Sequence, residues 1–540
     1  MRLSLPLAAC ATSAMLSPLA SAALDGNGLG SAYIEHTPTA IGSVVGIDIG
    51  SPAAPNGVVI LSVSDGIGPV NHPLLGTICF DTFSPAYFII VYAADANGNV
   101  HLDVPLANNP ILASLPPLYA NGFAIEPGAS AGDPPVFSLS KTVRFQWMLE
   151  DSYTAVEPLA QERALHSATP LNDDPRDEDV RVFVAGGHTN FFMQPDPVGT
   201  TELFHPLKHS FDAGPDLITP RAGHQAQRLD DGRILLIGGT GDGGVGLDSC
   251  EIYDPVTNTM SAAAPMSTSR LAFASSKLPD GRVLVSGGYV DFSNAIFDFV
   301  GTMNGAQDTA EIYDPVTDTW TPLVQQMASK RAGHAQVTLP SGDILIISGT
   351  NGGSTGQFGG AFPTWTTSCE IYNIATGTLF PTASLVPGRA GFGASVLGNG
   401  DVLLTGGTRA GGSYGEAVAS NTCHVYDGAT WTNVASLTQT VAFHTQVPTA
   451  DGGALIHGGM IGDLSTLVST SITGKHDGTT YTPLNLIGTN SAVPAQLDAP
   501  RGTHTMTELY DGSFLILGGA SSLDAFTPLN FSDGYRFIAP

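Results

Sequence analysis

Seven short apolar runs, each ending in a pair of small residues, recur along the C-terminal part of the chain. Runs of this length between turn residues predict β-strands, and their spacing of about 50 to 60 residues predicts a repeat architecture. The closing pair is Gly-Gly in every copy but one, where it is Ser348-Gly349. The seven runs span residues 182–187, 234–239, 283–288, 344–349, 402–407, 454–459 and 514–519.

A second pattern, upstream of the runs, predicts a hairpin in front of most of them. Two-residue turns such as Asp231-Gly232 and Asn399-Gly400 stand directly before the apolar run, and such pairs favour tight antiparallel hairpins. The first copy differs, because residues 172–179 form a longer acidic loop there. The segment before each turn reads Arg-Ala-x-His or a variant of it: Arg163 to His166, Arg221 to His224, Arg270 to Phe273, Arg331 to His334, Arg389 to Phe392, Val441 to His444 and Arg501 to His504.

Two further segments follow most runs. Cys250-Glu251-Ile252-Tyr253 and its later copies come first, and a short stretch bearing Trp320, Trp431 or Tyr481 comes next. Four short strands between turns make one blade of a β-propeller, so seven copies predict seven blades. A single blade cannot bury both of its faces, and blades therefore stack until the ring closes.

The glycine pair, the tyrosine after it and the tryptophan a few residues later resemble the repeat of the kelch family. The resemblance covers roughly residues 151–540 and rests on seven copies. It implies a seven-bladed β-propeller of the galactose oxidase type, as found in secreted bacterial proteins. In such propellers ligands bind at the face formed by the loops after the glycine pairs.

The ends of the repeat region predict how the ring closes. After Gly519 there is room for one more strand, near Tyr535 to Phe537, but hardly for two. Upstream, Asp151-Ser152-Tyr153-Thr154 matches Asp318-Thr319-Trp320-Thr321 of the third repeat. We therefore expect the outermost strand of the last blade to come from residues near Tyr153, which leaves no open edge there.

The segment before the repeats predicts a small all-β domain. Residues 58–63, 87–92 and 100–104 are expected to be strands, with Asn97-Gly98 as a hairpin turn. We assign residues 1–22 to a signal peptide, 23–148 to a β-sandwich-like domain and 149–540 to the propeller. The predicted fold class is all-β.

The first residues indicate export. Arg2, an apolar run to Leu19 and Ala20-Ser21-Ala22 form a secretory signal, so we expect a secreted protein. Lipid attachment at Cys10 is the alternative, and the apolar stretch before Cys10 is short for it. No later segment has the ~20 apolar residues that a membrane-spanning helix needs.

The charge balance narrows the range of partners. The chain has 20 Lys and Arg against 48 Asp and Glu, a formal net charge of −28. Nucleic acids and anionic membranes are therefore disfavoured as partners. The acidity also fits a secreted protein kept soluble by its charge.

The repeated arginines are the first candidate for ligand binding. A ring of forked donors at the channel mouth would suit carboxylates, sulfates or sugar acids. The alternative is that each arginine tethers its own blade to nearby carbonyl groups. The candidates are Arg163, Arg221, Arg270, Arg331, Arg389 and Arg501.

Histidines and cysteines at repeat positions favour packing over metal chemistry. Phe273 and Phe392 replace histidine in two copies, which argues against ligation. Cys250, Cys369 and Cys423 occupy one repeat position, so we expect small buried residues and not disulfides. The copper site of galactose oxidase needs a cysteine joined to a tyrosine, and none of these three stands out for that role. We expect no metal and no cofactor.

Two long loops supply the second candidate site. The loop after the third glycine pair carries Phe297 and Phe299, and the loop after the fourth carries Phe362 and Trp365. Long loops with aromatic side chains often bind ligands, although packing over the domain is an equal alternative. The sequence thus predicts a non-catalytic binding or scaffolding propeller for an unknown protein or carbohydrate ligand. The alternative is a carbohydrate-active enzyme, either galactose-oxidase-like or sugar-epimerase-like.

Overall fold

The chain divides into two compact units, which are described separately. One comprises Met1–Glu150 with Asp174–Glu178 and Tyr510–Gly512, and the other comprises the rest. The computed structural model describes residues 153–172, 181–189, 196–206, 209–295, 298–355, 361–411, 416–463, 467–484, 500–509, 512–521 and 530–537, and the backbone of the strands before residue 150. The predicted signal peptide and Cys10 lie outside the described residues.

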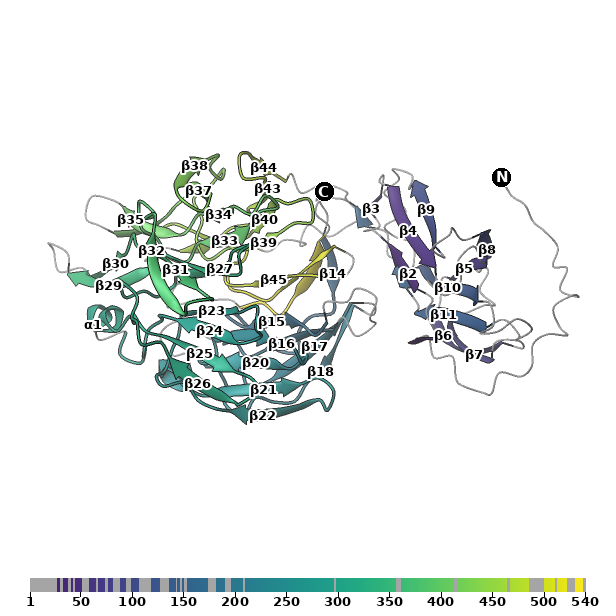
Figure 1. The fold of residues 1–540 in the computed structure, drawn as a ribbon, viewed down its shortest axis with the longest axis horizontal. Helices are drawn as coiled ribbons and strands as arrows, with labels where there is room; N and C mark the ends of the chain where they lie inside the picture. Colours follow the sequence, from purple (N-terminus) through teal and green to yellow (C-terminus); the bar gives the residue numbers. More distant parts are fainter. Residues whose placement is uncertain are drawn as a thin grey trace, which may run out of the picture. The chain divides into compact units, whose positions relative to one another are not determined.

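The second unit is a ring of seven four-stranded antiparallel sheets, the blades (Figure 1). The first strands of successive blades contact one another around the whole ring and are therefore innermost. Blades one to three hold, from inside outward, β15 (Ser167–Pro170), β16 (Val182–Ala185), β17 (Thr201–His205), β18 (Ser210–Ala213); β19 (Gln225–Arg228), β20 (Ile234–Ile237), β21 (Cys250–Asp254), β22 (Thr259–Ala263); and β23 (Ala274–Lys277), β24 (Val283–Ser286), β25 (Ala310–Asp314), β26 (Thr319–Pro322).

The remaining four blades repeat this arrangement. They hold β27 (Ala335–Thr338), β28 (Ile344–Ile347), β31 (Cys369–Asn373), β32 (Thr378–Thr382); β33 (Gly393–Val396), β34 (Val402–Thr405), β37 (Cys423–Tyr426), β38 (Trp431–Val434); β39 (Thr445–Pro448), β40 (Ala454–His457), β43 (Thr473–His476), β44 (Tyr481–Pro483); and β45 (Thr505–Glu508), β46 (Phe514–Leu517), β47 (Gly534–Phe537), β14 (Tyr153–Val156). The seven-bladed propeller predicted from the repeats is confirmed.

Each apolar run forms the second strand of a blade, and all four of its residues are buried. The Asp231-Gly232 turn before β20 has the backbone conformation expected of a tight hairpin turn, since Gly232 has a φ of 87°, which an L-residue rarely adopts. Burial on both faces explains why the first three residues of each of these strands are all apolar and do not alternate. The fourth residue is polar in blades three, five and six, where it is Ser286, Thr405 or His457. The core therefore lies between neighbouring blades.

The aromatic residues of the third and fourth strands join adjacent blades. Tyr313 of blade three is fully buried among Leu235, Ile237 and Cys250 of blade two. Trp320 follows on the outer strand and donates from its indole nitrogen to the carbonyl of Ala264 at 2.9 Å. Trp431 of blade five binds Ala383 in the same way at 3.0 Å. The three cysteines at the repeat position are free and buried, as predicted.

The ring closes with a strand from before the first blade. β14 pairs antiparallel with β47, and Tyr153 lies opposite Phe537. The side chains of Val156 and Leu159 then pack in the core between blades seven and one. The predicted closing strand near Tyr153 is confirmed.

The described elements of the first unit are all β-strands. Its main sheet contains β1 (Asn27–Leu29), β11 (Val136–Lys141), β10 (Leu118–Glu126), β5 (Val58–Ser64), β8 (Phe88–Ala93) and β12 (Val143–Phe145). Smaller sheets contain β2 (Tyr33–His36), β4 (Val44–Gly50) and β9 (Asn99–Pro105); β3 (Ala40–Ile41) and β13 (Met148–Leu149); and β6 (Ile67–His72) and β7 (Gly76–Phe80).

The three predicted strands of this unit are present, but the hairpin at Asn97-Gly98 is wrong. β8 before it pairs with β5, whereas β9 after it pairs with β4 in another sheet. A turn-forming pair allows a hairpin but cannot impose one when longer partner strands compete. The sandwich arrangement and the domain limits stay predictions. Over the described residues, no helix has the length and apolar character needed to cross a membrane.

Candidate functional site

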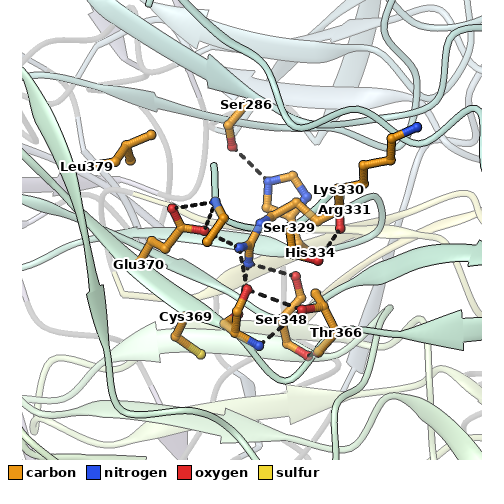
Figure 2. A network of polar contacts seen from close by, with 12 residues as sticks. Ser286, Ser329, Lys330, Arg331, His334, Ser348, Thr366, Cys369, Glu370 and Leu379 are labelled. Carbon is orange, nitrogen blue, oxygen red and sulfur yellow. Dashed lines mark hydrogen bonds and ion pairs between the residues drawn. The ribbon is translucent and has the colours of Figure 1, made fainter. Parts of the chain in front are cut away.

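The repeated arginines lie inside the blades and not on the channel surface. All six have a relative exposure of 0 or 1 %. Arg331 shows the arrangement (Figure 2): Nη1 donates to the carbonyls of Ser348 at 3.1 Å and Ser368 at 3.0 Å. Nη2 donates to the hydroxyl of Ser368 at 2.8 Å and forms an ion pair of 2.6 Å with Glu370. One guanidinium group thus ties the end of the second strand to the third strand of its blade.

The glutamate of each pair also holds the chain that crosses between blades. Glu370 accepts the backbone N–H of Ala328 from the preceding crossover, and Glu251 accepts those of Ile218 and Thr219. Arg163–Glu202, Arg221–Glu251 and Arg270–Glu311 repeat the pair at 2.6 to 2.8 Å. Burial lowers the pKa of Arg331, and the charge of Glu370 opposes that shift.

Blades five, six and seven depart from the Arg–Glu pair. In blade five, His424 replaces the glutamate beside Arg389, and burial lowers the pKa of His424 to about 4. In blade seven, Arg501 pairs with Asp533 at 3.0 Å and lies over the rings of Phe531 and Tyr535.

Blade six loses both partners of the tether together. Val441 stands for the arginine, and Gly474 lies at the position of the glutamate on the third strand. The ring of Tyr481 fills the space where a side chain at Gly474 would extend. An uncompensated buried carboxylate is thereby avoided.

These facts fit the tether alternative. Ligand contact by Arg163, Arg221, Arg270, Arg331, Arg389 and Arg501 stays a prediction, to which their burial lends no support. A repeated residue with many donors cannot be assigned to surface or interior from sequence alone. The signal that could have separated the two was the glutamate that accompanies the arginine in blades one to four.

The repeated histidines bond to hydroxyl groups of the preceding blade. Nε2 of His224 contacts Ser167 at 2.9 Å, and Nε2 of His334 contacts Ser286 at 2.8 Å. His166, His444 and His504 contact Thr505, Thr405 and Thr445 in the same manner. Desolvation lowers the pKa of all five, to about 3 for His224 and about 4 for His444.

Phenylalanine replaces histidine where the preceding blade offers no hydroxyl. In the blade before Phe273, the corresponding cross-strand pair is Gln225 with Ile237. In the blade before Phe392, it is Ala335 with Ile347. Each of the five histidines instead faces a cross-strand pair of the preceding blade in which one residue is Ser or Thr. These residues pack at the seams between blades, which fits the packing interpretation.

The mouth of the channel is lined by main-chain groups. The residue before each repeated His or Phe has a positive φ, as Leu165, Ala272, Phe443 and Thr503 do. In six of the seven blades its N–H donates to the carbonyl of the matching residue in the preceding blade, for example Gly223 to Leu165 at 2.9 Å and Phe443 to Gly391 at 2.8 Å. These six backbone donors are thus used within the ring.

Insertions after the second strands of blades three to six rise on one face, and we call them the rim. They contain helix α1 (Phe299–Asn304) and three hairpins, β29 (Thr350–Thr355) with β30 (Ala361–Trp365), β35 (Thr408–Gly411) with β36 (Glu416–Ala419), and β41 (Met460–Ile461) with β42 (Val468–Ser469). In Figure 1, α1, β29, β30 and β35 project from the same part of the propeller. The long loops of blades three and four were predicted, whereas the hairpins of blades five and six were missed.

Contacts join the rim from blade to blade. Asn304 at the end of α1 accepts the N–H of Gly353 at 3.0 Å. β30 contacts β36, and the N–H of Ala419 donates to Gly462 at 3.0 Å. Ser469 then donates to Ser521 of blade seven at 2.8 Å. The rim is a continuous wall and not a set of separate loops.

The predicted aromatic residues lie in this wall. Phe299 packs against a buried cluster that includes Tyr289 and Met303. Phe362 and Trp365 are half-buried on β30, whereas Phe297 lies outside the described residues. Within the described part of the chain, no group of three or more His, Cys, Asp or Glu side chains is placed to hold a metal ion.

Comparison with known proteins agrees with the repeats. The family described as Kelch motif matches residues 229–267 and 274–325, which span blades two and three. The chain carries Kelch motifs on a seven-bladed propeller. No curated protein matches it.

Two solved structures are similar to this chain. A novel fungal alcohol oxidase of the AA5 family, in complex with copper, is 16% identical with a TM-score of 0.52, over 72% of this chain and 76% of that one. YjhT is 16% identical with a TM-score of 0.46, over 61% of this chain and 99% of that one. At such identity the likeness to the oxidase shows the Kelch propeller fold alone.

Proposed function

We propose that the chain is a secreted, non-catalytic binding propeller whose ligand, a protein or a carbohydrate, docks on the rim face. The continuous rim of blades three to six carries this proposal. A blade needs only a short connection between its second and third strands, and blades one and two carry no hairpin there among the described residues. Elaborated loops on a rigid scaffold are where propellers and similar folds bind their partners.

The ligand-contacting residues in this proposal are Phe299, Phe362 and Trp365. The side chains of Phe362 and Trp365 are partly exposed on β30, and their rings offer faces for stacking on a sugar or an apolar side chain. The buried arginines are left out because their guanidinium groups are bonded inside the blades. Export by the N-terminal signal belongs to the same proposal.

Binding screens with matched variants test this function. Purified full-length protein would be screened against neutral and acidic glycans and against candidate secreted proteins. For any ligand found, Trp365→Ala is expected to weaken binding about tenfold or more while the melting temperature stays within a few degrees. Val316→Ser, at an exposed turn between the third and fourth strands of blade three, is the control that should leave binding unchanged.

Two results would overturn the proposal. Binding that is unaffected by rim substitutions would place the ligand elsewhere. Turnover of a glycan, or stoichiometric copper with a radical signal, would favour an enzyme on the same fold.

A further inference from the structure

We propose that the loops of blades two and three form a docking patch for a basic segment of a partner protein. The docking patch consists of Val245 and Val290 with the carboxylates of Asp242, Asp291 and Asp298. This inference rests on the proposed binding function, because it names one partner chemistry for the same face of the ring.

Two exposed aliphatic side chains form the apolar part of the docking patch. Val245 is 51% exposed and Val290 is 40% exposed. Their loops touch through the main chain, since Phe292 donates to the carbonyl of Gly244 at 3.0 Å. Ser269 also fixes the carbonyl of Val290 at 2.7 Å. Main-chain contacts between the two loops thus hold the exposed valines of two blades near each other.

The charged side chains carried by these two loops are all carboxylates. Asp242, Asp291 and Asp298 are exposed. Residues 240–249 and 289–308, which form the two loops, contain no lysine or arginine. The exposed Lys330 donates to the carbonyl of Asn304 at 3.3 Å, at the end of α1 away from Asp298. The carboxylate of Asp291 is held by the N–H and hydroxyl of Ser293 at 2.7 and 2.9 Å, contacts that orient it but leave its charge uncompensated.

A basic polypeptide segment satisfies both parts of the docking patch. The methylene stem of a lysine or arginine covers aliphatic surface while its charged end reaches a carboxylate. An anionic membrane would be repelled. A second copy of this chain is a poor occupant, because it has 48 acidic against 20 basic residues and buries seven of its arginines. A sugar would gain more from aromatic faces than from valines.

The test uses full-length protein and a labelled synthetic peptide of alternating lysine and leucine. Its binding would be followed by fluorescence anisotropy at about 0.15 M salt, where long-range attraction between charges is screened. The test variants are Asp242→Asn with Asp291→Asn, and Val245→Ser with Val290→Ser. A peptide with glutamine in place of lysine measures the contribution of charge.

The control pair is Val256→Ser with Val316→Ser. Both valines are 91% exposed and each follows an Asp-Pro pair, as in Asp254-Pro255-Val256. Arg233 lies near Asp254 and Arg282 near Asp314, whereas the two loops of the docking patch contain no basic residue. The control pair therefore also replaces two exposed valines by serine, but in turns with a different set of neighbouring charges.

We expect both test variants to weaken binding of the basic peptide about tenfold and the control to leave it unchanged. Equal affinity in all variants would overturn the docking patch, because attraction to the acidic protein as a whole would then explain binding. Failure of the wild-type protein to bind, or equal binding of the glutamine peptide, would also overturn it. None of these results would affect a ligand whose binding depends on Trp365, so the docking patch and the proposed function can fail separately.

Discussion

At each repeated arginine, one side chain joins the second strand, the third strand and the crossover from the preceding blade. The guanidinium group reaches two carbonyls and a carboxylate, and that carboxylate holds the backbone of the crossover. A planar fork with five donors suits this task, whereas a lysine could not make the same set of bonds. If either the arginine or the glutamate is removed, the other remains buried without its partner.

We expect Arg331→Ala to lower the free energy of unfolding by about 3 to 5 kcal/mol, because Glu370 would remain buried without its partner. Arg331→Ala combined with Glu370→Ala should cost less than the sum of the single changes. Urea denaturation of the full chain measures both. Arg282→Ala is the control, since Arg282 pairs with Asp280 at the surface and its loss should cost about 0 to 1 kcal/mol. A small effect of Arg331→Ala, close to that of the control, would contradict the tether.

The buried histidines predict a loss of stability in acid. Their pKa values in the folded protein lie below the ordinary value of about 6.5 that applies in the unfolded chain, so the unfolded chain binds more protons as the pH falls. Stability should therefore be full above that pH and decline between it and the folded pKa, about 4 for His444.

Replacing Ser286 by Ile and His334 by Phe together should make that decline shallower. The double variant copies the Ile237–Phe273 pairing, which removes one titrating group and keeps the seam packed. The free energy of unfolding at pH 7 and pH 5 is the measurement. An unchanged difference between the two pH values would show that His334 does not contribute to acid sensitivity.

At the scale of strands, closure of the ring depends on β14. β14 supplies the fourth strand of blade seven, and Val156 and Leu159 beside it fill the core between blades seven and one. We expect a chain beginning at Glu162 to aggregate or to melt well below one beginning at Glu150, because it loses a strand and opens an edge. Light scattering and thermal melts of the two chains compare them. Equal melting temperatures would mean that the ring closes without β14.

Repetition explains why the strands could be predicted and the candidate site could not. Seven copies of one pattern fix the strand positions and even the closure at Tyr153, because the strands assigned in one copy can be compared with those in the other six. Sequence reasoning failed where a residue's surroundings depend on a segment that is distant along the chain. The burial of Arg331 depends on Glu370 across the blade, and the pairing of β8 with β5 depends on a distant strand. Loop pairs such as β35 and β36 were missed because they contain no repeated residue.

At the scale of the whole ring, blade six is the one without a charged tether. Val441 and Gly474 replace the arginine and glutamate, and the tyrosine ring that fills the space makes no ion pair. We expect the amides of Ala454–His457 to exchange hydrogen faster than those of Ile344–Ile347 in blade four, because fewer interactions oppose local opening there. Exchange followed by mass spectrometry resolves the two strands. Equal protection would show that apolar packing replaces the tether in full.

The repeated position holds histidine where the preceding blade offers a hydroxyl and phenylalanine where it offers none. This match restricts the order in which the blades can follow one another. Exchanging blades three and four in the gene would set His334 against Ile237 and Phe392 against Ser286, so two of the three new junctions would lack a suitable partner. Duplicating blade three alone would likewise set Phe273 against Ser286. Duplicating blades three and four as a unit would create no mismatch, since Phe273 would follow Ile347. A propeller of this kind can therefore gain or lose blades in this region in pairs more readily than singly.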